Sequence, residues 1–185
     1  MIKVVIQLNK EVIIMKMTNS VIYSEAIFSD DEKYRYKLTR TWDKDKKKAT
    51  IIMLNPSKAS ELKSDRTVIN VTNFLIDNNY GSINIVNLFA YMSTEPKELS
   101  QRSNEFEKYN DKYIIESLEK SDIVIVGWGS DNKKYISRKR QVEELLKPHI
   151  NKIKCFKDDK GKKSRHPRDL TEKWILENYE FTFSS

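Results

Sequence analysis

The chain has few residues of the kinds that usually mark a disulfide or metal site. It contains one cysteine, Cys155, and two histidines among its 185 residues. A single cysteine excludes an internal disulfide and a zinc site built from several thiolates, and it is typical of a reducing compartment. Cys155 follows a short apolar and basic run, which favours a half-buried thiol on a strand over a nucleophile. We therefore expect no metal, no cofactor and a cytoplasmic protein.

Long uninterrupted apolar runs are also missing. The apolar stretches within residues 1–17 are broken by residues 9–11, so neither can cross a bilayer or act as the core of a signal peptide. We expect no membrane partner. Because Met15 and Met17 are alternative translation starts, residues 1–17 are interpreted as an N-terminal extension, and residues 18–185 as a single domain.

Basic side chains are in excess. The 34 Lys and Arg residues exceed the 27 Asp and Glu residues and give a net charge of +7. A positive charge attracts anionic partners, and here it favours nucleic acid over a membrane surface. Net charge alone does not identify a site, so a basic domain without such a partner stays an alternative.

After residue 48 the apolar pattern predicts alternating strands and helices. Short β-branched runs predict four buried strands, at 49–54, 83–88, 123–126 and 152–156. Helical patterns follow at 68–75, 106–118, 133–147 and 169–178, with Tyr109 and Ile175 expected in the core. Residues 21–28 and 34–42 predict an antiparallel hairpin ahead of them. We therefore predict a three-layer α/β/α fold, with a central four-stranded mainly parallel sheet preceded by a β-hairpin.

Polar side chains follow the predicted strands, where ligands bind in open α/β sheets. The loop after the first strand contains Asn55, Pro56 and Ser57, which suit either an ordinary turn or a catalytic loop. Asn87 interrupts the next apolar run, just before Phe89. Its amide must be satisfied by local backbone or by the edge of a base.

The two remaining loops are basic. After the third strand, Lys133 and Lys134 stand at the start of a predicted helix, where backbone N–H groups can hold a phosphate. The spacing is not that of a P-loop. In the fourth loop, residues 160–170, five of the eleven residues are Lys or Arg, and His166 lies among them. Such a loop suits a phosphate backbone, although a solvated basic loop explains it equally well.

These pieces, in this order, resemble the motifs of uracil-DNA glycosylases. They resemble the domain-of-unknown-function 1643 family more closely, a group of small bacterial and phage proteins without an assigned activity. The matching pieces are Leu54-Asn55-Pro56-Ser57, Asp65 with Thr67, Asn87-Leu88-Phe89-Ala90, Trp128-Gly129 and His166-Pro167. The glycosylase resemblance implies the glycosylase-like fold and DNA, single- or double-stranded, as the partner.

The same resemblance implies roles for single residues. Asn55 would orient the attacking water, and Asp65 would act as an acid or simply cap a helix. His166 would stabilise charge on the departing base. An extruded base would contact Asn87, Pro56, Ser57 and Phe89. The strand would be held by Lys133, Lys134, Lys162, Lys163, Arg165 and Arg168, with Leu170 as a wedge.

Two departures from the glycosylase motifs bear on activity. Ser57-Lys58 replaces the Tyr-His pair of the uracil-specific enzymes, and the Phe on which uracil stacks has no clear counterpart. We therefore expect a nucleic-acid-binding protein in which standard uracil excision is lost or altered. An active DNA base glycosylase and a protein-binding regulatory module on the same scaffold are the alternatives.

Overall fold

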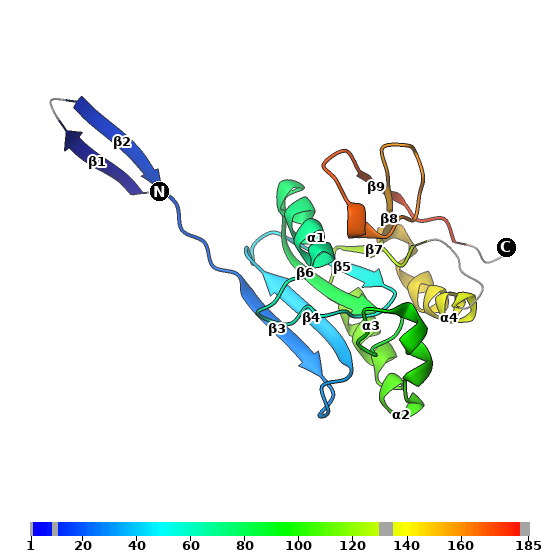
Figure 1. The fold of residues 1–185 in the computed structure, drawn as a ribbon. Helices are drawn as coiled ribbons and strands as arrows, with labels where there is room; N and C mark the ends of the chain where they lie inside the picture. Colours follow the sequence, from blue (N-terminus) through cyan, green and yellow to red (C-terminus); the bar gives the residue numbers. More distant parts are fainter. Residues whose placement is uncertain (1, 9–10, 130–134, 182–185) are drawn as a thin grey trace.

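The computed structural model describes residues 2–8, 11–129 and 135–181, and it has a mixed α/β fold (Figure 1). Its main sheet has seven strands in the order β3-β4-β6-β5-β7-β8-β9. These are β3 (Tyr23–Phe28), β4 (Arg35–Thr41), β5 (Lys47–Met53), β6 (Tyr80–Asn87), β7 (Ile123–Val126), β8 (Ile153–Lys157) and β9 (Ile175–Asn178). The α/β class is confirmed.

The expected four-stranded sheet is wrong in its number of strands. The four predicted strands, β6, β5, β7 and β8, run parallel to one another. The β3–β4 hairpin does not stand ahead of this sheet but extends it, because β4 pairs antiparallel with β6. At the other edge β9 pairs antiparallel with β8. Antiparallel strands thus cover both outer parallel strands, whose unpaired backbone groups would otherwise face solvent.

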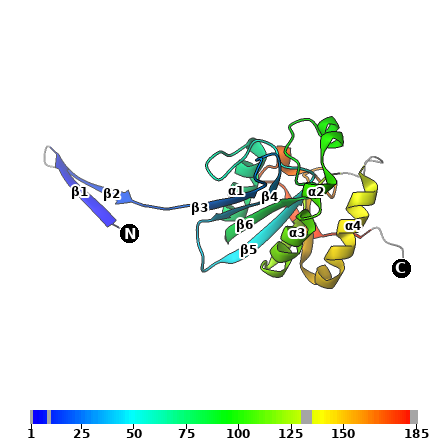
Figure 2. The same cartoon turned by 90° about the horizontal axis from the view of Figure 1, so that it is seen from below.

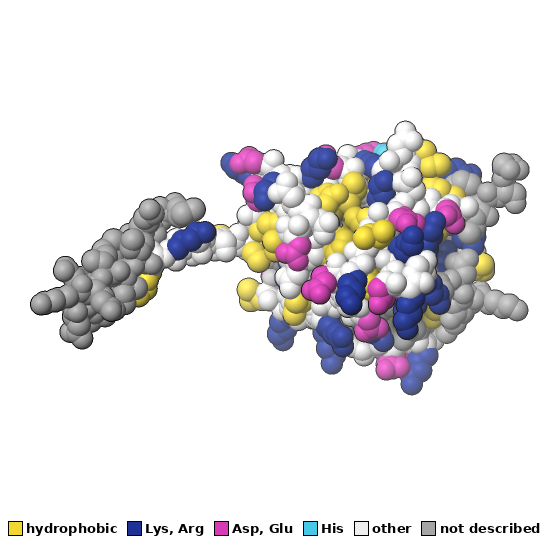
Figure 3. Space-filling view, turned by 90° about the horizontal axis from the view of Figure 1, so that it is seen from above, with side chains coloured by type: hydrophobic (Ala, Val, Ile, Leu, Met, Phe, Trp, Pro, Cys, Tyr) yellow, Lys and Arg dark blue, Asp and Glu magenta, His cyan; other side chains and the backbone are white. Residues whose placement is uncertain are grey.

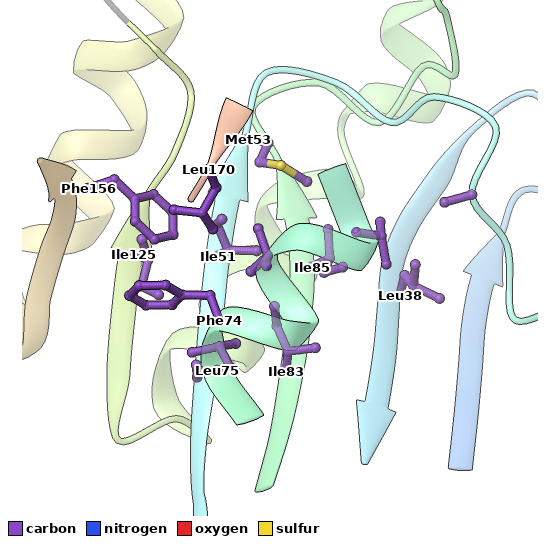
Figure 4. Packing of buried hydrophobic residues seen from close by; sticks show 14 of the residues in the cluster. Leu38, Ile51, Met53, Phe74, Leu75, Ile83, Ile85, Ile125, Phe156 and Leu170 are labelled. Atoms are coloured by element: carbon purple, nitrogen blue, oxygen red, sulfur yellow. The ribbon is translucent and has the colours of Figure 1, made fainter. Parts of the chain in front are cut away.

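Helices cover both faces of the sheet. On one face, α1 (Arg66–Asp77) packs Phe74 and Leu75 against Ile51 and Ile85, as Figure 4 shows. On the other face, the core contains side chains of α3 (Asn110–Glu119) and α4 (Ile136–Leu146). Shorter segments are α2 (Asn104–Glu107) and three 3-10 turns at Pro96–Gln101, Lys147–Lys152 and Pro167–Asp169. Strand alternation sends Ile51 to the first face and Ile52 to the second, which is why β5 is apolar throughout its buried part.

The predicted helix at 169–178 is wrong. Leu170 and Trp174 are buried as expected, but Ile175 is 52% exposed and begins strand β9. The spacing of Leu170 and Trp174 is also that of one helical face, which explains the misassignment. β9 forms because the outer edge of β8 needs hydrogen-bond partners, and Phe156 pairs with Leu176 there.

The predicted helix at 106–118 is divided into α2 and α3, and Tyr109 at the break is 49% exposed rather than buried. Phe106 and Tyr113 do pack inward. Their rings stack on Tyr34 and Tyr36 of the hairpin segment, with centroids 4.8 and 5.1 Å apart. The predicted helix at 133–147 is α4, which begins at Ile136.

The two N-terminal strands form a separate hairpin. β1 (Ile2–Leu8) and β2 (Glu11–Met17) pair antiparallel with each other in their own two-stranded sheet. Figures 1 and 2 show this hairpin standing away from the main sheet. No helix within the described ranges has the length and apolar character needed to cross a membrane.

Candidate functional site

A cavity of about 390 Å³ lies at the carboxyl ends of the parallel strands. Its walls come from the loops after β5, β6, β7 and β8, from the first turn of α1 and from the start of β4. The structure therefore brings together most of the polar residues singled out in the sequence. Those that line the cavity are Asn55, Ser57, Asp65, Lys162, Lys163, Arg165, His166 and Arg168.

The side chain of Asn55 ties the loop after β5 to a second loop of the chain. Its amide nitrogen donates hydrogen bonds to the carbonyl oxygens of Ser93, at 2.8 Å, and Pro56, at 3.1 Å. Its Oδ1 accepts no hydrogen bond from the described residues and is the atom left to face a ligand. Both interpretations of this loop stay open, because Asn55 both bridges two backbone carbonyls and lines the cavity, where a ligand can donate a hydrogen bond to its Oδ1.

Asp65 is the N-cap of α1. Its Oδ1 accepts the backbone N–H of Val68 at 2.9 Å, which satisfies one of the unpaired donors in the first turn. Its Oδ2 accepts the hydroxyl of Ser57. Both carboxylate oxygens are thus engaged, and the helix-cap interpretation is confirmed.

His166 is half-buried in the cavity wall and presents one ring nitrogen as a donor. Its Nδ1 accepts the backbone N–H of Arg168 at 3.2 Å. In the neutral ring the proton is therefore on Nε2, which has no hydrogen-bond partner among the described residues. Burial and the nearby Arg168 charge lower the pKa of His166, against the opposing effect of Asp65 and Asp169. His166 is consequently a neutral N–H donor at neutral pH.

Arg35 lines the same cavity and was missed by the sequence analysis. A register shift between β3 and β4 pairs Ile27 with Lys37 but Phe28 with Arg35, which inserts one extra residue in β4. This bulge turns Arg35 toward the α1 face, where it lines the cavity, while Tyr36 packs against Tyr113 on the other face. In the sequence, Tyr34, Tyr36, Leu38 and Thr39 do not alternate perfectly with polar residues, and this irregularity is the signal that could have revealed Arg35.

Arg35 is only 1% exposed. One terminal nitrogen donates to the carbonyl oxygen of Ala59, whereas Nε has no partner. Burial lowers its pKa to about 10, against the attraction of Asp65. The guanidinium therefore stays charged at neutral pH.

The residues expected to contact an extruded base are mostly elsewhere. Asn87 is fully buried beside Met53 and does not line the cavity, although Met53 does. Neither polar atom of the Asn87 side chain has a hydrogen-bond partner among the described residues. Phe89 is buried under the guanidinium of Arg102, 4.6 Å from its centroid. Pro56 is also buried, so Ser57 alone of this group reaches the cavity.

Leu170 is 9% exposed and packs in the core on the α1 side, so it does not protrude as a wedge. Lys133 and Lys134 lie outside the described residues.

The basic loop is partly neutralised by acidic neighbours. Lys163 pairs with Glu177 and Glu180, and Arg165 pairs with Asp158. Lys162 and Arg168 line the cavity without an ion pair among the described residues. On the face seen in Figure 3, Lys and Arg side chains are interspersed with Asp and Glu. Arg35, Lys162 and Arg168 thus place positive charge without an ion pair among the described residues at the cavity.

Within the described ranges, no group of three or more His, Cys, Asp or Glu side chains is arranged to hold a metal ion.

The model of one protein family, described as "Protein of unknown function (DUF1643)", matches residues 35–168. The matched region begins at Arg35, ends at Arg168 and contains every cavity residue discussed above except Asp169. No curated protein and no solved structure matches the chain.

Proposed function

The chain belongs to the DUF1643 family, and we propose that it binds nucleic acid at the cavity, with standard excision of uracil lost or altered. One observation carries the proposal. Four basic side chains from a single loop, at positions 162, 163, 165 and 168, surround a cavity that also contains Asn55 and His166.

Electrostatics supports this assignment. Lys162 and Arg168 are available to phosphates directly, whereas Lys163 and Arg165 must first exchange their carboxylate partners. Contacts of this kind provide affinity that does not depend on sequence and that weakens as salt rises. The cavity volume falls within the range of about 300–1,000 Å³ that is usual for small-ligand sites.

The positions of Phe89 and Asn87 support the loss of standard excision. Phe89 is covered by Arg102 and does not line the cavity, and Asn87 lies behind the cavity wall. An extruded base thus does not stack on Phe89, a contact of a kind worth about 1–3 kcal/mol. Trp128 lines the cavity but is only 5% exposed. Asn55 carries an amide, which is a poor base for activating water.

The scaffold is proposed to be glycosylase-like. Two features support this proposal. The polar loops after β5, β7 and β8 surround one cavity, and they follow one another in the chain in the same order as the glycosylase motifs.

Hydrolysis of an N-glycosidic bond is a second candidate, favoured by the convergence of Asn55 and His166 on the cavity. Asn55 Oδ1 can position a water molecule, and the neutral Nε2–H of His166 can donate to a departing base. Asp65 contributes as a base only if its Oδ2 exchanges Ser57 for water.

Binding and cleavage assays on matched oligonucleotides test both candidates. Single- and double-stranded DNA is titrated at several salt concentrations, and the same strands carrying uracil, mismatches or deaminated purines are assayed for abasic sites. We expect salt-sensitive binding without abasic sites. The double variant Lys162→Gln, Arg168→Gln should bind more weakly than the wild type. Its control is the double variant Lys44→Gln, Lys120→Gln, which removes the same charge from exposed positions away from the cavity and should bind more tightly than the first variant.

Binding that is equally weakened in both double variants contradicts a specific role for the cavity, and undetectable binding rejects the proposal. Abasic sites that disappear in Asn55→Ala and His166→Ala establish the second candidate instead.

A further inference from the structure

Arg35 is a buried charge facing a cavity without an ion-pair partner among the described residues. Its side chain makes one hydrogen bond, to the carbonyl oxygen of Ala59, and Nε makes none. Burying an ionised group is unfavourable unless charges or hydrogen bonds compensate it. Since Arg35 lines the cavity, an anion entering there can supply that compensation.

The charges around Arg35 leave an excess of positive charge. Arg40 lies on the same face and donates to Ser64 and to the carbonyl oxygens of Ser60 and Lys63. Asp65 acts on both guanidinium groups, but its oxygens bind Val68 and Ser57 rather than either arginine. One carboxylate thus faces two arginines.

The first turn of α1 adds donors at the same place. Thr67 and Val68 line the cavity, and the N-terminus of a helix carries partial positive charge. Asp65 caps the N–H of Val68 only. The backbone N–H groups of Arg66 and Thr67 have no preceding helical turn to bind and are suited to oxyanions. The hydroxyl of Thr67 is a further donor.

From this geometry we infer that Arg35 and the first turn of α1 form a subsite for a terminal phosphate, the monoester group of a nucleotide or of a nucleic-acid end. Arg35 is reached only from inside the cavity, because it is 1% exposed. An internal phosphodiester continues into the strand on both sides, whereas a terminal phosphate has a chain on one side and can enter. A phosphomonoester also carries nearly two negative charges at neutral pH, which matches the local excess of positive charge.

This inference rests on the proposed function in one respect: if that function holds, the molecule that bears the phosphate is a nucleic acid. The phosphate chemistry itself depends on Arg35 and α1 alone.

Calorimetric titrations test the subsite. The ligands are inorganic phosphate, a nucleoside monophosphate, and three versions of one oligonucleotide, which carry a 5′-phosphate, a 3′-phosphate or only hydroxyl ends. One phosphorylated end should bind about tenfold or more tighter than the hydroxyl-ended strand, the factor expected for a hydrogen bond to a charged group. The free phosphate and mononucleotide titrations distinguish a small ligand from a strand end.

Arg35→Lys should remove this preference, because lysine lacks the planar fork of donors. Arg40→Lys is the matched control, since Arg40 is a buried arginine on the same strand that does not line the cavity. Asp65→Asn keeps an N-cap residue and removes a nearby negative charge, so it should bind phosphate more tightly than the wild type. This last variant tests the subsite even if Arg35→Lys fails to fold.

Equal affinity for phosphorylated and hydroxyl-ended strands overturns the subsite and leaves salt-sensitive nucleic-acid binding intact. An equal loss in Arg35→Lys and Arg40→Lys, or unchanged phosphate affinity in Asp65→Asn, overturns it as well. Phosphate or mononucleotide binding that depends on Arg35, without binding of any oligonucleotide, establishes the subsite and rejects the proposed function.

Discussion

His166 is held by one backbone hydrogen bond in the wall of the cavity, and its surroundings disfavour the charged ring. Burial is the largest cause, followed by the charge of Arg168. In the folded state its pKa is thus below the ordinary value of 6.5, and the unfolded chain binds the proton more readily as the pH falls. His166 therefore supports stability above about pH 6.5, and this contribution is lost as the pH falls through the folded-state pKa.

His166→Gln should make the free energy of unfolding less sensitive to pH. We expect the wild type to lose more stability than the variant between about pH 7.5 and pH 5, because the glutamine has no proton to gain. Urea unfolding at several pH values measures the difference. Parallel pH profiles for the two proteins would mean that the ring titrates alike in the folded and unfolded states.

Asp65 combines a cap on α1 with a charge beside Arg35. Asp65→Ala should lower the free energy of unfolding by about 1 kcal/mol, the usual effect of removing an N-cap side chain. Asp65→Asn should lower it less, because asparagine is also a good N-cap residue. Urea unfolding of both variants at neutral pH is the measurement. An equal loss in both would assign the stabilisation to the negative charge rather than to the cap.

At the scale of single elements, the β4 bulge and strand β9 show how tertiary contacts override local pattern. The bulge places Arg35 and Leu38 on the same face although they are three residues apart, so the strand does not follow strict alternation. β9 takes the place of a predicted helix because the open edge of β8 offers backbone partners to residues 175–178. The imperfect alternation of residues 34–39 is a local sign of the bulge, whereas the open edge of β8 is not visible in the local sequence.

The β1–β2 hairpin is a separate element, and removing residues 1–17 should leave the melting temperature of the remaining chain nearly unchanged. These strands pair only with each other in the described structure. A loss below about 1 kcal/mol corresponds to a shift smaller than about 2–4 °C. Calorimetry compares the two chains.

Trp174→Ala provides the control for this measurement. It removes a buried ring that packs against Phe156 and should cost about 3–5 kcal/mol, a loss that the same calorimetry must resolve. A comparable loss on removing the hairpin would show that it stabilises the main fold.

At the scale of the whole molecule, we expect nucleic-acid binding to depend less on the net charge of +7 than on the basic side chains without an ion pair at the cavity. Changing Lys162 and Arg168 to Gln should make the slope of log affinity against log salt shallower by about 0.7 per lost contact on single-stranded DNA, or about 0.9 on duplex. Changing Lys163 and Arg165 to Gln should have a smaller effect, because their acidic partners already compensate them. Fluorescence anisotropy across a salt series measures both slopes. The reverse order would indicate that those ion pairs open when nucleic acid binds.

Local pattern was sufficient for much of the fold and for part of the candidate site. The β-branched runs predicted β5, β6, β7 and β8 because buried parallel strands need apolar side chains on both faces. The loops after these strands were then placed at one edge by the geometry of parallel strands, which is why Asn55 and His166 line the same cavity.

Other features depend on contacts between distant segments. The orientation of Arg35 follows from a bulge in pairing with β3, and the burial of Asn87 follows from its place beside Met53 in the completed sheet. The ion pair of Lys163 likewise involves Glu177 of a separate strand, β9. The sequence by itself determined which residues are apolar, polar or charged and where its regular strands run, because these properties are local. The tertiary structure decided which charges stay unpaired at the cavity, because register, burial and ion pairing arise only when separate strands meet.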